Sequence, residues 1–78
     1  MNWFSISEAC KRGDIEFLKK CDSEKFDTIH ANMACLFNQI AVLNYFYTLG
    51  VCPTEKGREY AKKFKNENVI MWLDTKNL

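Results

Sequence analysis

A chain of 78 residues with a hydrophobic fraction of 47% is long enough for one small core and too apolar for a disordered segment. Its formal net charge of +1 gives no overall field that would attract nucleic acid or anionic lipid. The N-terminus lacks the basic and apolar regions of a secretory signal peptide, so we expect a cytoplasmic protein.

An alanine marks the same point in three similar segments of the chain. These alanines are Ala9, Ala34 and Ala61, at offsets of 25 and 27 residues. The eighth and ninth residues after each alanine are apolar: Phe17–Leu18, Val42–Leu43 and Val69–Ile70. The fourth and fifth residues break each pattern: Gly13–Asp14, Asn38–Gln39 and Lys65–Asn66. The chain therefore contains three copies of one structural unit.

Each copy is predicted to form two short helices joined by a tight turn, because its apolar residues recur at i, i+3 and i+4. In chain order we expect helices at about residues 3–12, 14–21, 27–37, 39–49, 55–64 and 67–75. Gly13 and Asn38 suit the left-handed turn that ends a first helix. Asp14 and Asn66 can cap the helix that follows, and Thr54 is the expected N-cap of the fifth helix.

The longest charge-free stretch runs from Thr28 to Thr54 and contains no Asp, Glu, Lys or Arg. Its polar residues and Pro53 interrupt the apolar runs well short of the roughly 18 residues that a membrane span requires. The stretch covers nearly the whole second copy. We therefore expect it to be the middle unit, covered by protein on both sides, and we expect no membrane partner.

Two segments carry a resemblance to ankyrin repeats. The segment ACKRGDIEFL, which begins at Ala9, is similar to the turn between the two helices of an ankyrin repeat. The segment LNYFYTLGVCPT, which begins at Leu43, is similar to the end of the family's second helix. The later segments LGVCPTEKGREYAKK and VIMWL resemble the shortened ankyrin-like arrays of large DNA viruses. The resemblance, which spans about residues 5–75, implies an all-α domain over residues 1–78. It would be an ankyrin-like solenoid of three stacked helix-turn-helix hairpins with short loops, its repeats at about 3–22, 27–50 and 54–75.

Three features depart from the ankyrin pattern. The Thr-Pro-Leu-His signature is missing from all copies, and Glu67 occupies a turn position that is usually aliphatic. The copies are also about six to eight residues shorter than the family repeat, which predicts plain loops in place of projecting β-hairpin fingers. Another type of helical-hairpin repeat is the alternative fold.

The chemistry-bearing residues do not form a recognisable catalytic pattern. His30 is the sole histidine, and Cys35, five residues later, points to a different helix face. We expect His30 to pack or cap a helix start, and we expect no enzyme activity and no cofactor. Four cysteines, at positions 10, 21, 35 and 52, contain no C-x-x-C pair, which favours buried, reduced thiols. Two disulfides, or a zinc site that includes His30, are the alternatives.

The ankyrin resemblance also implies a binding surface. Residues one before, two after and three after each alanine would line a concave groove: Glu8, Lys11, Arg12, Met33, Leu36, Phe37, Tyr60, Lys63 and Phe64. An apolar centre flanked by charge is typical of a protein-recognition patch. The implied function is a non-catalytic protein–protein interaction module, a monomer or weak homodimer, that binds and blocks an unidentified partner protein in the cytoplasm, the host's if the protein is viral. The alternative is that these side chains pack into the core between units.

A second function class is suggested by the basic cluster of residues 56–65, in which Tyr60 and Phe64 lie between Lys56, Arg58, Lys62, Lys63 and Lys65. Such residues can contact phosphates and stack on bases, so a small helical nucleic-acid-binding protein is the alternative. Interspersed acids, and the i, i+4 pair Glu59–Lys63, favour a solvated face instead. The main hypothesis therefore includes no nucleic-acid partner.

Overall fold

Six α-helices and one short 3-10 turn make up the regular structure of residues 3–78, the part of the chain that the computed structural model describes. Their bounds are α1 Trp3–Arg12, α2 Ile15–Lys20, η1 Ser23–Lys25, α3 Thr28–Leu36, α4 Ile40–Thr48, α5 Glu55–Lys63 and α6 Glu67–Thr75. No β-strand occurs within residues 3–78. The predicted all-α class is confirmed, and each expected helix is found within two residues of its predicted ends.

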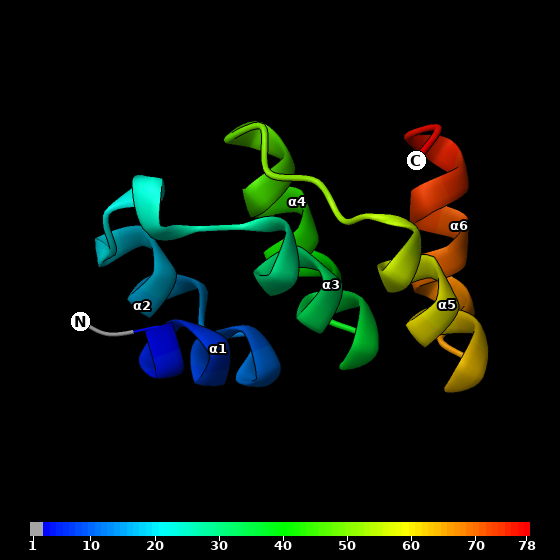
Figure 1. The fold of residues 1–78 in the computed structure, drawn as a ribbon, viewed down its shortest axis with the longest axis horizontal. Coiled ribbons are helices and arrows are strands. Elements are labelled where there is room, and N and C mark those ends of the chain that lie inside the picture. Colours follow the sequence, from blue (N-terminus) through cyan, green and yellow to red (C-terminus); the bar gives the residue numbers. More distant parts are fainter. Residues whose placement is uncertain (1–2) are drawn as a thin grey trace.

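The helices contact one another in three successive pairs, α1 with α2, α3 with α4, and α5 with α6. Figure 1 shows these pairs following one another along the long axis of the molecule. The first helices also touch their counterparts, α1 against α3 and α3 against α5, and the second helices do the same, α2 against α4 and α4 against α6. The middle pair is therefore covered on both sides.

The same left-handed turn ends α1, α3 and α5. The residues with positive φ are Gly13 at 73°, Asn38 at 58° and Lys65 at 57°, each four positions after a repeat alanine. The next backbone N–H donates to the alanine carbonyl oxygen at 2.8–2.9 Å: Asp14 to Ala9, Gln39 to Ala34 and Asn66 to Ala61. The three alanines are fully buried. The predicted role of Gly13 and Asn38 is confirmed, and the third copy forms the turn although its residue is a lysine.

A second left-handed position ends α4 and α6, but not α2. Gly50 and Asn77 have φ values of 80° and 60°, and the residue after each donates its N–H to a carbonyl five positions back at 2.9 Å. In the first copy α2 has six residues, and the chain leaves it in an extended conformation at Cys21. The shorter second helix accounts for the smaller offset between the first two copies.

The core lies between the row of first helices, α1, α3 and α5, and the row of second helices, α2, α4 and α6. Its largest fully buried side chains include Phe46, Leu18, Leu43 and Leu73. Within the uncharged middle stretch, both α3 and α4 contribute fully buried residues. The stretch is not interior throughout, because Ile29, Phe37, Tyr47 and Leu49 are exposed. Among residues 3–78, no helix is both long and apolar enough to cross a membrane.

The predicted caps are partly confirmed. The Asp14 carboxylate accepts from the Phe17 N–H at 3.1 Å, and the Thr54 hydroxyl accepts from the Lys56 N–H at 3.3 Å. The prediction for Asn66 is wrong, because its side chain makes no capping hydrogen bond. Its amide instead donates to the carbonyl oxygens of Cys35 and Leu36, at 2.9 and 3.0 Å.

Gln39 makes the corresponding bond one unit earlier. Its side-chain amide donates to the Lys11 carbonyl oxygen at 2.8 Å. The last carbonyls of an α-helix lack intrahelical partners, so a side-chain N–H₂ from the next unit can satisfy them. In both places this bond ties one unit to the end of the preceding first helix.

His30 caps the N-terminus of its own helix, α3. Its Nδ1 accepts a hydrogen bond from the Asp27 N–H at 3.0 Å, while the Asp27 carboxylate accepts from the Thr28 N–H at 2.6 Å. The imidazole is fully buried and lies edge-on to Phe26, with ring centroids 6.5 Å apart. The expected packing and capping role is confirmed.

Candidate protein-binding groove

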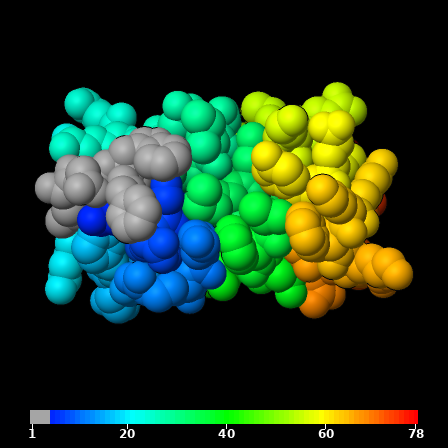
Figure 2. Space-filling model, turned by 60° about the horizontal axis from the view of Figure 1, so that its bottom comes forward, coloured from blue at the N-terminus to red at the C-terminus, as the bar shows by residue number. Residues whose placement is uncertain are grey.

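A hollow of about 400 Å³ lies between α3 and α5. The residues that line it are Thr28, Ile29, Asn32, Met33, Leu36, Thr54, Lys56 and Tyr60. The face on which α1, α3 and α5 succeed one another is turned toward the viewer in Figure 2. Met33, Leu36 and Tyr60, three of the residues predicted from the sequence, are brought together in this hollow.

Two rows of side chains run along the helices that border the hollow, although Phe37, Lys63 and Phe64 are not among its lining residues. We call Ile29, Met33, Leu36 and Phe37 the α3 ridge, and Lys56, Tyr60, Lys63 and Phe64 the α5 ridge. The two ridges occupy equivalent positions of the second and third copies, since each residue of the α5 ridge follows its counterpart in the α3 ridge by 27 residues. Residues at i, i+4, i+7 and i+8 share one side of a helix, which is why each set forms a row.

The ridge side chains stay accessible. Ile29, Phe37 and Phe64 are 50%, 41% and 54% exposed. Met33, Leu36 and Tyr60 are half-buried, and the charged members are exposed. These side chains therefore do not lie in the fully buried core between units, which was the alternative placement.

The floor of the hollow is held by Asn32 and Thr54. The Asn32 Nδ2 donates to the Thr54 hydroxyl oxygen at 2.9 Å, and the Thr54 N–H donates to Asn32 Oδ1 at 2.9 Å. A Cβ added at Gly57 would lie 2.7 Å from Asn32 Oδ1 and 3.0 Å from Cys35 Sγ. The Asn32–Thr54 hydrogen bonds and the missing side chain at Gly57 thus set how closely α5 approaches α3. This distance sets the width of the hollow.

The basic side chains of α1 form ion pairs with acidic residues two or three positions away in the sequence. Lys11 lies 3.6 Å from a Glu8 carboxylate oxygen, and Arg12 lies 3.4 Å from one of Asp14. The Lys11 ammonium also lies over the Phe37 ring, 5.2 Å from its centroid. Glu8 and Arg12 line a separate hollow of about 230 Å³, together with Ser5 and Phe17. The groove expected across all three units is therefore divided into two parts.

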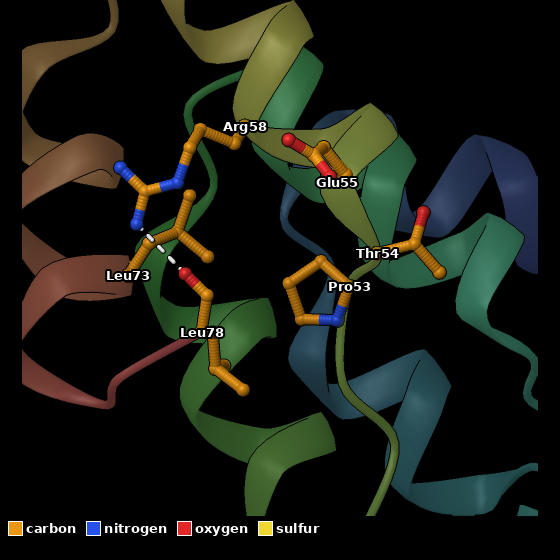
Figure 3. Close-up of a pocket in the computed structure, with 6 residues that line it drawn as sticks. All are labelled: Pro53, Thr54, Glu55, Arg58, Leu73 and Leu78. Carbon is orange, nitrogen blue, oxygen red and sulfur yellow. Dashed lines mark hydrogen bonds between the residues drawn. The ribbon is translucent and has the colours of Figure 1, made fainter.

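The basic cluster of residues 56–65 is also divided. Arg58 donates to Asp74 Oδ1 at 2.8 Å and to the Leu78 carbonyl oxygen at 2.7 Å. Figure 3 shows Arg58 beside Leu78 in another hollow, also lined by Pro53, Thr54, Glu55 and Leu73. Arg58 thus ties α5 to the end of α6, while Lys56 and Lys63 lie on the α5 ridge. The expected Glu59–Lys63 pair is not among the ion pairs of residues 3–78.

The sequence interpretation missed five lining residues: Thr28, Ile29, Asn32, Thr54 and Lys56. Helical periodicity could have identified Ile29 and Lys56, since each precedes a predicted residue, Met33 or Tyr60, by one turn on the same helix face. Asn32 and Thr54 are 22 residues apart, and no local pattern connects them.

Burial shifts the pKa values of three buried side chains, Cys10, His30 and Cys35. Burial raises the pKa of the Cys35 and Cys10 thiols to about 12. Burial lowers the pKa of His30, partly offset by the Asp27 carboxylate. A buried thiol of high pKa is a poor nucleophile, because the thiolate is the reactive form. Within residues 3–78, no cluster of three or more His, Cys, Asp or Glu side chains is placed to hold a metal ion.

Comparison with protein-family models, with curated proteins and with solved structures found no match to this chain.

Proposed function

We propose that this protein is a non-catalytic protein-interaction module that binds a partner through the hollow between α3 and α5. The observation that carries the proposal is the apolar α3 ridge, which remains exposed beside a preformed hollow. A folded chain that leaves apolar side chains together at a concave surface can gain free energy by covering them. Binding there would block the corresponding surface of the partner.

The fold that we propose for this role is an ankyrin-like stack of three hairpins. Its support is the recurrence of the turn after Ala9, Ala34 and Ala61, and of the amide bond from Gln39 and Asn66 to the preceding unit. Repeat stacks of this kind expose the first helices of successive units as one extended face. The two ridges lie on that face.

The test is a selection of random displayed peptides on the immobilised protein, followed by titration of the enriched binders against variants. Ile29→Ser and Met33→Ser should keep their helical circular dichroism and weaken binding by about thirtyfold, as loss of an interface anchor does. Met71→Ser is the matched control, because Met71 is 66% exposed on α6, away from the hollow. Binders that respond to Met71→Ser and not to Met33→Ser would contradict the proposal.

A second candidate function is nucleic-acid binding by residues 56–65. One observation favours it: Lys56, Lys62, Lys63 and Lys65 take part in none of the ion pairs within residues 3–78. It predicts binding of a single-stranded oligonucleotide that weakens steeply as salt rises. Absence of binding at low salt would eliminate this candidate.

A further inference from the structure

We infer that the hollow selects an acidic helical segment, with apolar side chains against the α3 ridge and two carboxylates, two helical turns apart, at Lys56 and Lys63. This inference rests on the proposed function and adds the chemistry of the partner. Its first support is the charge of the site. Lys56 alone is charged among the residues that line the hollow.

Three acidic residues near the hollow are engaged elsewhere, whereas Glu59 lies between the two lysines on α5 and forms an ion pair with neither. The Asp27 carboxylate accepts the Thr28 N–H at the start of α3. Glu55 lines the separate hollow of Figure 3, together with Arg58. Glu8, on the neighbouring helix, pairs with Lys11. Lys56 and Lys63 are therefore left without a carboxylate within ion-pair distance in the part of the chain that the structure describes.

The spacing of the two lysines sets the spacing of the acids. Lys56 and Lys63 are seven residues apart on α5, which corresponds to about 10 Å along the helix axis. Lys63 lies beyond the hollow, next to Phe64, with its ammonium 5.6 Å from the ring centroid. A helical segment lying along α5 would match these cations with carboxylates at i and i+7.

The apolar ridge has the matching repeat. Ile29, Met33 and Leu36 are separated by four and three residues, so their side chains follow one another at about 4.5–6 Å along α3. A partner helix with apolar residues at the same intervals can place its side chains between them, as in helix-in-groove recognition. The opposite ridge then supplies the two cations. The favoured occupant is apolar on one edge and acidic on the other.

The experiment uses the full chain and a phage-displayed library of random peptides of about 16 residues, long enough for four helical turns. Sequences enriched on the wild-type protein should contain paired acidic residues seven apart, with apolar residues at helical spacing between them. The most enriched peptide is then synthesised together with a matched version in which Gln replaces both acids. The acidic peptide should bind about three- to tenfold more tightly at about 50 mM salt, and less so at about 500 mM.

A double-mutant cycle assigns the preference to the two lysines. In the Lys56→Gln/Lys63→Gln protein the acidic and Gln peptides should bind equally, because coupling is lost when either partner is removed. Lys19→Gln/Lys20→Gln, on exposed positions of α2, is the control and should keep the full preference.

The possible results separate the inference from the proposed function. Enrichment of neutral or basic peptides that Met33→Ser abolishes would overturn the acidic preference and leave the groove function standing. No enrichment, or enrichment unaffected by Met33→Ser, would overturn the groove function itself. A labelled single-stranded oligonucleotide that binds more tightly than every selected peptide, and is lost in the double Gln variant, would assign the lysines to phosphate and overturn the inference.

Discussion

Asn32 and Thr54 bind each other through two hydrogen bonds of 2.9 Å, although 22 residues separate them in the chain. The pair joins the middle of α3 to the N-cap of α5, so the same contact begins a helix and fixes its distance from its neighbour. Since the hollow lies between these two helices, its shape depends on this pair as much as on the side chains that line it.

Asn32→Ala should lower the free energy of unfolding by about 2 kcal/mol, because it removes both hydrogen bonds between the buried Asn32 side chain and Thr54. Urea denaturation followed by circular dichroism measures the change. Asn68→Ala, at an exposed position of α6, is the control and should stay within about 0.5 kcal/mol of wild type. Equal effects would show that the Asn32 bonds contribute nothing.

Gly13→Ala should destabilise the protein more than Gly50→Ala. Both glycines have positive φ, so each substitution should cost about 1–2 kcal/mol of backbone strain. At Gly50 the new methyl group meets open space, whereas at Gly13 it would collide with Gln39 Oε1. Displacing Gln39 also breaks its bond to the Lys11 carbonyl oxygen, which should add about 1 kcal/mol. Melts of the two variants give the difference directly, and a larger effect at Gly50 would contradict this account.

Leu43→Ala should lower stability by about 2–5 kcal/mol, since it opens a cavity in the middle unit where the side chain is fully buried. Leu49→Ala, at the exposed end of the same helix, serves as its control. Denaturant midpoints provide the comparison. If both variants unfold at the same midpoint, the middle unit does not form the shared core.

The four cysteines should react in two classes. Cys10 and Cys35 are fully buried, and burial raises their thiol pKa values to about 12, so they should react only when the protein opens. Cys21 and Cys52 are half-buried and should be modified first. A thiol reagent added to native protein should therefore show two fast and two slow equivalents. Cys52→Ser should remove one fast equivalent, and four equal rates would contradict the assignment.

Stability should fall as the solution becomes mildly acidic, because of His30. Burial lowers its folded-state pKa below the ordinary value of about 6.5, so the unfolded chain binds the proton first. The stabilisation is complete above about pH 6.5 and is lost as the pH falls through the lower folded pKa. Protonation at Nδ1 would also remove the acceptor for the Asp27 N–H.

His30→Gln tests this linkage, since Gln at the third helical position can still accept from the N-cap N–H but does not titrate. Urea midpoints measured between about pH 7.5 and pH 5 should decline for the wild type and change less for the variant. A wild-type profile as flat as that of the variant would show that His30 is not coupled to folding.

Local features of the sequence determined the helices and the left-handed turns that end α1 and α3. Apolar spacing is a property of each helix alone, and the positive φ at Gly13 and Asn38 is required by the tight turn wherever the hairpin lies. Composition also indicated that the uncharged unit is the middle one, since the first and third units carry the charges, although part of the stretch remains exposed. The helix and turn predictions depend on interactions within about one helical turn.

The tertiary structure alone decided which polar groups meet. Asn66 was predicted to cap its own helix, yet its amide reaches the carbonyl oxygens at the end of α3, because the adjacent unit presents unsatisfied acceptors there. Arg58 joined a basic cluster in the sequence but pairs with Asp74, whereas Lys56 remains beside the hollow. Hydrogen bonds and ion pairs act over a few ångströms between residues far apart in the chain, so the packing of the units, and not the spacing of residues, selects them.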